Sequence, residues 1–107
     1  MIKRPMKAPT EGCPDSVLEQ LLYPLAGSPK IDGIRGLKSE DGLLSSTLKL
    51  IGNRHIQKCL SDSIYNFLDG ELAVGKPYRD LEDDDDDVFH RTSGPVRRAA
   101  GEPDFKF

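Results

Sequence analysis

The sequence predicts an α+β domain in which short helices accompany a mostly antiparallel sheet. Ten glycines and eight prolines among 107 residues indicate many turns and short elements. Glu40-Asp41-Gly42 is typical of a hairpin turn between strands at residues 34–38 and from Leu43 onward, because glycine tolerates positive φ. Apolar spacing and capping residues favour short helices at residues 17–22 and 54–60.

The N-terminal segment, residues 1–12, is predicted to be an extended lead-in, because Pro5 and Pro9 block regular structure. Its three positive charges belong to Lys3, Arg4 and Lys7. We favour a solvated tail, since chain ends are commonly loosely held. An arm that contacts phosphate is the alternative.

The first helix is expected over residues 17–22. Ser16 and Glu19 have the spacing of a capping box at its start. Its apolar residues share one face, so we expect this helix to pack against the rest of the domain. Pro24 disfavours helical backbone at Tyr23, which limits the helix to about two turns.

The following segment, residues 25–31, is predicted to be a strand. Pro29 fits a strand only at an edge or a bulge, and Lys30 would stand near the strand's end. Asp32-Gly33 should then turn the chain into the strand at residues 34–38.

The second helix, residues 54–60, is predicted to begin after Asn53, which is a good capping residue. Ile56 and Leu60 are one turn apart, so both should face inward. Residues 61–63, rich in serine and aspartate, should end this helix.

The C-terminal part combines strands with irregular segments. Residues 65–74 should form a strand that is interrupted at Asp69-Gly70. Residues 75–88 are expected to be a loop, and residues 89–101, with scattered arginines, a surface loop. Alternation at residues 104–107 indicates the start of another strand.

Charge is unevenly distributed along the chain. Fifteen basic and 18 acidic side chains give a net charge of −3, but six of the acids lie at residues 82–87, and the remaining balance is 15 − 12 = +3. Like charges repel, so we predict a solvated loop. A cation site formed by this run is the alternative. The net charge neither requires nor excludes a nucleic-acid partner.

The number of cysteines and the hydropathy of the chain bear on the cellular compartment of the protein. Cys13 and Cys59 are too few for a disulfide framework or a zinc site, and a reducing cytoplasm is the default. The N-terminus lacks the apolar stretch of a signal peptide. No segment approaches the ~20 apolar residues of a membrane span, so we expect no membrane partner.

The strongest chemical pattern is Lys30-Ile31-Asp32-Gly33-Ile34-Arg35. A lysine amine attacks a nucleotide phosphate only when it is deprotonated, and an ordinary lysine has a pKa of ~10.4. We expect apolar walls from Ile31 and Ile34, together with the positive charge of Arg35, to lower that pKa. Gly33 should let the backbone turn tightly.

A second constellation, Asp69-Gly70-Glu71, lies on a predicted strand about forty residues further along the chain. A carboxylate inside an apolar strand needs a hydroxyl, a cation or an arginine as its partner. Taken alone, each pattern is compatible with surface charges on a hairpin or a strand bulge. The two patterns together, in this order along the chain, are a much more specific signal than either pattern alone.

These motifs resemble the N-terminal part of the adenylation (nucleotidyltransferase) domain of ATP-dependent DNA ligases, and more narrowly the small ligases of bacteriophages. Residues 28–36 resemble the motif that carries the nucleophilic lysine, and Leu68-Asp69-Gly70-Glu71-Leu72 resembles the third motif of the family. Three flanking stretches also resemble the family: residues 45–56, 88–94 and 102–107. The resemblance implies part of an ATP-grasp-like ligase fold over residues 1–107.

The resemblance also implies an activity and its residues. Lys30 would take AMP from ATP, with Mg²⁺ as the metal ion, and AMP would pass to the 5′-phosphate of nicked duplex DNA. Asp32 would orient the site, Arg35 would contact ribose or phosphate, and Glu71 would hold the ribose hydroxyls or the metal. The residues expected near adenine are Ser28 and Pro29. Such an enzyme would serve DNA replication, repair and recombination in the cytoplasm of a bacterial host.

Other features of the family are missing from this sequence. The family usually has an arginine at the position of Ser46, and its later motifs and OB-fold domain have no counterpart here. We therefore expect an N-terminal portion that seals nicks weakly or not at all alone, with a separate C-terminal ligase half as a candidate partner. An incomplete sheet would expose apolar edges and promote self-association.

Two alternatives remain open. One is a non-catalytic DNA- or nucleotide-binding module derived from a ligase, which the serine at position 46 favours. The other is an RNA ligase or capping-type nucleotidyltransferase, since those enzymes share the lysine pattern. The flanking segments fit a DNA ligase better.

Overall fold

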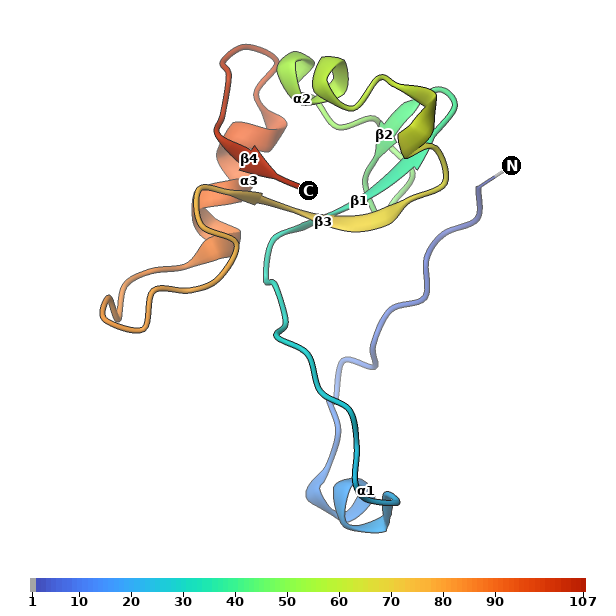
Figure 1. Ribbon diagram of the computed structural model, residues 1–107, viewed down its shortest axis with the longest axis vertical. Coiled ribbons are helices and arrows are strands. Elements are labelled where there is room, and N and C mark those ends of the chain that lie inside the picture. Colours follow the sequence, from blue (N-terminus) through green and yellow to red (C-terminus); the bar gives the residue numbers. More distant parts are fainter. Residues whose placement is uncertain (1) are drawn as a thin grey trace.

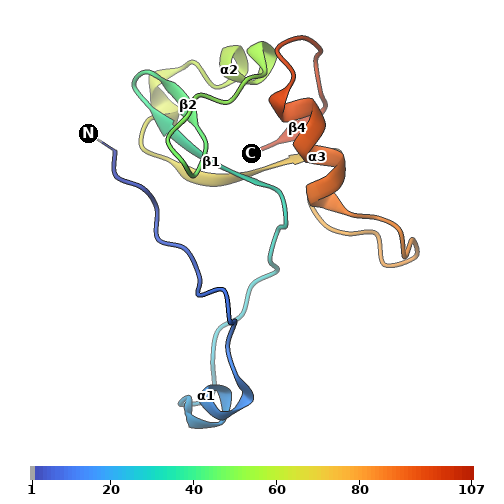
Figure 2. The ribbon, with the colours of Figure 1, turned by 180° about the vertical axis from the view of Figure 1, so that it is seen from behind.

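The structure, a computed structural model, describes residues 2–107 and has the expected α+β architecture. A four-stranded antiparallel sheet has the order β2-β1-β3-β4. Helix α2 lies above this sheet. The residues before β1, from 2 to 33, form an N-terminal arm that extends from the other side of the sheet (Figures 1 and 2). The bounds of the strands are β1 Ile34–Ser39, β2 Gly42–Leu44, β3 Asp69–Val74 and β4 Phe105–Lys106.

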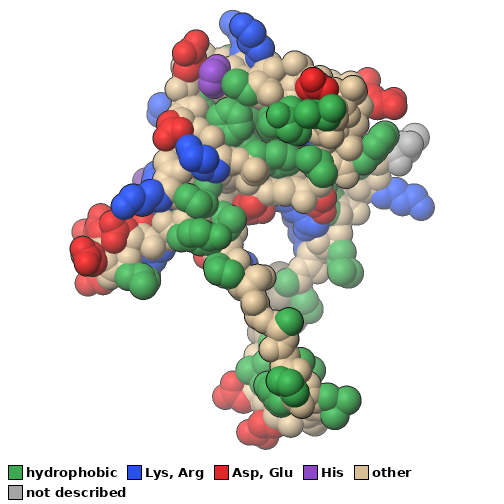
Figure 3. Space-filling view, viewed as in Figure 1, with side chains coloured by type: hydrophobic (Ala, Val, Ile, Leu, Met, Phe, Trp, Pro, Cys, Tyr) green, Lys and Arg blue, Asp and Glu red, His purple; other side chains and the backbone are tan. Residues whose placement is uncertain are grey.

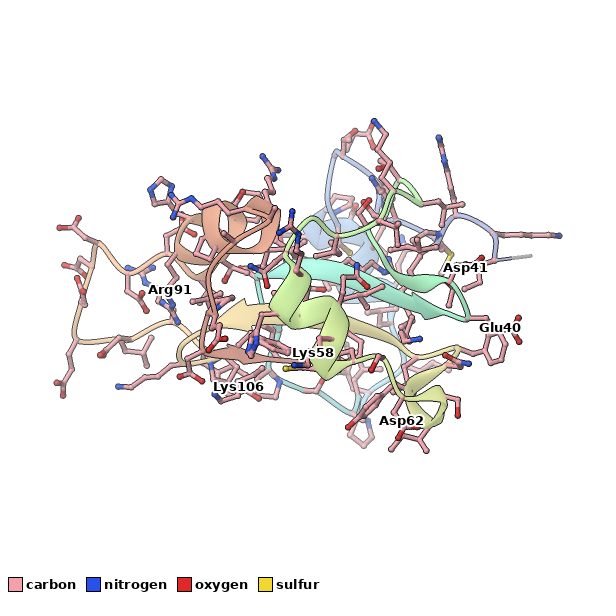
Figure 4. The ribbon with its side chains drawn as sticks, turned by 90° about the horizontal axis from the view of Figure 1, so that it is seen from above. Glu40, Asp41, Lys58, Asp62, Arg91 and Lys106 are labelled. Atoms are coloured by element: carbon pink, nitrogen blue, oxygen red, sulfur yellow. The ribbon has the colours of Figure 1, made fainter. Side chains whose placement is uncertain are left out.

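The predicted hairpin is confirmed. β1 pairs with β2 in a register that places Leu37 opposite Leu44 and Ser39 opposite Gly42. Gly42 has a φ of +133°, which a residue with a side chain rarely adopts. The turn residues Glu40 and Asp41 lie at the exposed tip (Figure 4). Local turn chemistry was sufficient to predict this element.

Helix α2, Arg54–Cys59, also forms as predicted. The Asn53 side chain caps it by accepting a hydrogen bond of 2.9 Å from the Ile56 amide. The amide group of Asn53 donates to the carbonyl oxygens of Arg98 at 3.0 Å and Gly101 at 3.2 Å, so this buried residue also fixes the chain after α3. Ile56 and Leu60 face the core, as expected.

The hydrophobic core lies between the sheet and the helices α2 and α3. It contains Leu43, Ile51, Ile56, Leu60, Leu72 and Val96. Leu43, Ile56 and Leu72 have no exposed surface, which makes each sensitive to truncation. Leu72 belongs to β3, directly after Glu71, so the core anchors the strand that carries this acid.

Helix α3, Val88–Arg97, overturns the expected surface loop at residues 89–101. The Asp87 carboxylate caps it by accepting a 3.0 Å hydrogen bond from the His90 amide. Val88, Thr92 and Val96 recur every four residues and are buried. Their burial offsets the helix-breaking tendency of Pro95.

The arm differs from its prediction in three respects. Helix α1, Asp15–Gln20, begins after Pro14 without a side-chain cap, so the capping box at Ser16 and Glu19 is wrong. It has no buried residue, so it does not pack against the core. Residues 25–31 form no strand, because no neighbouring strand is available to pair with them.

β3 is also shorter than predicted. A 3₁₀ turn at Ser63–Tyr65 precedes it, and the strand begins at Asp69 instead of being interrupted there. The predicted loop at residues 75–88 is confirmed as far as residue 87, since α3 begins at Val88, and the strand expected at residues 104–107 forms at Phe105–Lys106. Within residues 2–107, no helix is long and apolar enough to cross a membrane.

Candidate functional site

Lys30 and Asp32 lie just before β1, and both side chains are exposed, by 86% and 68%. The Lys30 ammonium donates a hydrogen bond of 2.7 Å to Asp32 Oδ1. This bond and the charge of Asp32 raise the pKa of Lys30 above its ordinary value. The expected lowering of this pKa by apolar walls is therefore wrong in this structure, because the side chain is in solvent and beside a carboxylate.

Arg35 and Glu71 are paired residues on the neighbouring strands β1 and β3. Arg35 forms a two-pronged ion pair with Asp69, at 2.9 Å from Nε and 2.7 Å from Nη2. Its Nη1 donates to the carbonyl oxygen of Met6 at 2.7 Å. Arg35 is thus the partner expected for a carboxylate on this strand, here Asp69. Two of the five N–H donors of Arg35 stay available for a ligand.

The Arg35 contact changes the acidity of Asp69. Hydrogen bonding to the guanidinium, with its positive charge, lowers the pKa of Asp69. Asp69 therefore stays ionised and holds Arg35 in place across the strands. The fork geometry fixes the plane of the guanidinium as well as its position.

Glu71 is half-buried, and burial raises its pKa. A hydrogen bond from the Gly33 amide and the charge of Arg35 act in the opposite direction, but burial dominates. Gly33 is essential to this geometry, because a Cβ there would overlap the carbonyl oxygen of Leu72. The glycine thus brings the segment after Lys30 against the backbone of β3.

A cavity of about 560 Å³ joins the two motifs. Lys30, Asp32 and Glu71 line it, together with Asp87 and Phe89. A neighbouring cavity of about 380 Å³ includes Pro29, Arg35, Asp69 and Glu71 in its lining. The structure therefore brings together every site residue named from the sequence except Ser28, which is exposed in the arm.

Asp87 and Phe89 are site residues that sequence reasoning missed, because it assigned no helix at residue 88. The signal was available: a capping aspartate is followed by Val88, Thr92 and Val96 at helical spacing. The helix start places the exposed Phe89 ring, 49% accessible, beside the cavity.

The acidic run also borders the site. Asp84 to Asp87 line a cavity of about 500 Å³ with Lys30, Asp32 and Arg79. Residues 82–85 are exposed, as predicted, but Asp86 is partly buried and paired with Arg91 of α3, which joins the loop to that helix. The Asp80 amide and Arg91 lower the pKa of Asp86.

The oxygen donors of the site bear on Mg²⁺ binding. Among residues 2–107, no group of three or more histidine, cysteine, aspartate or glutamate side chains is arranged to hold a metal ion. Glu71 offers a single half-buried carboxylate. Such a site fits Mg²⁺ only when substrate phosphates and water supply the other oxygen ligands.

No protein-family model, curated protein or solved structure matches this chain.

Proposed function

We propose that Lys30 is the nucleophile of a covalent nucleotidyl transfer, as in ATP-dependent DNA ligases. In this proposal the chain accepts AMP from ATP, and nicked duplex DNA is the final acceptor. The observation that supports it is one cavity lined by Lys30, Asp32 and Glu71, which come from two motifs far apart in the sequence. A hairpin with unrelated surface charges would not require this convergence.

The proposed step forms a phosphorus–nitrogen bond. The exposed Lys30 ammonium loses a proton to solvent, and the amine then attacks the α-phosphorus of ATP. The bond between that phosphorus and the bridging oxygen breaks, and pyrophosphate leaves with the electron pair. The new nitrogen–phosphorus linkage loses a second proton to solvent. Phosphoryl transfer of this kind depends mostly on positioning and on charge neutralisation.

The neighbouring residues have distinct proposed roles. Asp32 orients the Lys30 side chain through their 2.7 Å contact. Arg35, held in its plane by Asp69, presents two free N–H donors to a phosphate or ribose oxygen. The Glu71 carboxylate accepts from ribose hydroxyls or contributes one oxygen to Mg²⁺. In this proposal Ser28 and Pro29 would lie near adenine.

Covalent labelling tests the proposal. The chain is incubated with Mg²⁺ and ATP labelled at the α-phosphate, then resolved on a denaturing gel, with and without an added C-terminal ligase half. We expect label on the wild type and none on Lys30→Ala or Lys30→Arg, whereas Lys106→Ala, a matched exposed lysine, keeps it. Absence of label under both conditions would refute a nucleophilic role. Labelling by GTP in preference to ATP would favour a capping-type enzyme.

A second candidate function is a non-catalytic binding module. The observation that favours it is the ion pair of Lys30 with Asp32, which raises the pKa of Lys30 and keeps the amine protonated at neutral pH. A protonated lysine attracts phosphate but cannot attack it. This alternative expects binding to nicked or double-stranded DNA that weakens with salt, without covalent label. Absence of binding at low salt would exclude it.

A further inference from the structure

The N-terminal arm ends in a helix that nothing covers. α1 lies at the far end of a loop, well away from the sheet (Figure 1). One side of the loop is held where Met6 accepts from Arg35, and the other side enters β1 at Ile34. The radius of gyration is 16.0 Å, whereas a compact chain of this length has about 13 Å.

A helix of six residues is not stable in water without packing. The hydrogen bonds of residues 9–25 are made among themselves, and no residue of α1 is buried. Apolar side chains nevertheless dominate the tip of the arm (Figure 3). They are Val17, Leu18, Leu21, Leu22, Tyr23 and Leu25, all at least 39% exposed. A surface that covered these side chains would therefore stabilise the helix.

The charge of the arm restricts what that surface can be. Residues 8–29 contain Glu11, Asp15 and Glu19 and no lysine or arginine. An acidic amphipathic helix fits an apolar groove with a basic rim.

A groove on the sheet-bearing part of the structure fits this description. It has a volume of about 610 Å³, and no acidic residue lines it. Ile34, Ile51 and Val96 form its apolar floor, and Leu50 and Phe89, 61% and 49% exposed, form apolar walls. Its exposed cations include Lys49 and Arg97. The groove therefore complements the arm in both polarity and charge.

We propose that α1 of one chain docks into this groove of a second copy, and that the exchange is reciprocal. The two attachments of the arm, at Met6 and Ile34, hold the tip away from its own sheet, which favours the groove of another molecule. Reciprocal exchange gives a closed two-fold dimer. Each contact is small, so the dimer has a dissociation constant on the order of micromolar. This proposal makes no use of Lys30 chemistry.

The test measures molar mass by sedimentation over a range of protein concentrations. We expect the wild type to pass from monomer to dimer as the concentration rises. An arm variant, Leu18→Asp with Leu21→Asp, and a groove variant, Leu50→Asp with Arg97→Glu, should each weaken the dimer by at least ~10-fold. All four side chains are exposed, so these changes leave the core intact. Leu81→Asp, at a site 90% exposed on the distant loop, is the matched control.

Mixing the two variants tests whether the arm docks into the groove of a second molecule. The mixture retains one intact arm and one intact groove on different chains, so it should associate more tightly than either variant alone and less tightly than the wild type, which has two such contacts. A wild type that stays monomeric at all concentrations would overturn the proposal, and so would a mixture that fails to associate. Loss of dimer in Leu81→Asp would show that association is unspecific.

Discussion

The Lys30 ammonium lies 2.7 Å from the carboxylate of Asp32, two residues further along the same exposed segment. Replacing the acid by Asp32→Asn removes both the charge and the strong acceptor that raise the pKa of Lys30. We expect the pKa of Lys30 to fall toward its ordinary value. NMR titration of ¹³C-methylated lysines measures it, with Lys58 on α2 as the internal control. An unchanged midpoint for Lys30 would contradict the role assigned to Asp32.

Glu71 is predicted to cost stability at neutral pH. Its folded-state pKa is raised by burial, so the folded protein favours the protonated form, and this contribution is lost as pH rises through that pKa. Glu71→Gln should therefore stabilise the protein at pH 7, by less than about 1 kcal/mol because the group is half exposed, with the gain vanishing near pH 4. Urea unfolding at several pH values measures this difference.

The matched control is Glu40→Gln at the exposed hairpin tip, where we expect a change within about 0.5 kcal/mol. The same Glu71→Gln variant should lose covalent labelling under the proposed function. Destabilisation at pH 7 would show that the Glu71 carboxylate is not in a penalising environment.

Asp69 is predicted to act on stability in the opposite sense. Its pKa is lowered by Arg35, so its contribution is present above the unfolded pKa of ~3.9 and is lost as pH falls through the folded value. Asp69→Asn should lower the urea midpoint at pH 7 by less than about 1 M, and the difference should disappear in acid. At high salt the difference should shrink, and a salt-independent difference would argue against an ion-pair origin.

Gly33 is predicted to tolerate no side chain. In Gly33→Ala the new Cβ would meet the carbonyl oxygen of Leu72, so either the segment carrying Lys30 or the edge of β3 must shift. We expect a loss of about 1–3 kcal/mol in unfolding free energy. Gly27→Ala is the matched control, because open space surrounds that glycine in the arm. Equal stability of both variants would rule out the close approach.

Asn53 is predicted to be critical for stability because its side chain hydrogen-bonds both the start of α2 and the segment after α3. It caps α2 through the Ile56 amide and donates to carbonyl oxygens after α3. Asn53→Ala should cost about 2–4 kcal/mol, combining a lost cap with unsatisfied carbonyls. Asn53→Asp retains the cap but not the donor, so thermal melts of the two variants separate these contributions. If Asn53→Asp matched the wild type, the donor role would be disproved.

Local patterns predicted the elements whose stabilising contacts are near in sequence. The hairpin at Gly42 depends on one glycine, and α2 depends on one capping asparagine, so both follow from short stretches. The same local reasoning failed for α3, where scattered arginines favoured a surface loop. It also placed a cap at Ser16 and a strand at residues 25–31, since propensity does not reveal whether a partner surface exists.

By itself, the sequence determined the order of the two motifs and the residue types that they bring. Only the tertiary structure decided their relationship: antiparallel pairing of β1 with β3 places Arg35 opposite Glu71 and within reach of Asp69. The tertiary structure also decided the direction in which the pKa of Lys30 shifts, because that pKa depends on the exposure of the side chain and on the nearest carboxylate. The physical reason is that burial, strand register and charge proximity are set by contacts between segments remote in the chain, which spacing along the sequence does not encode.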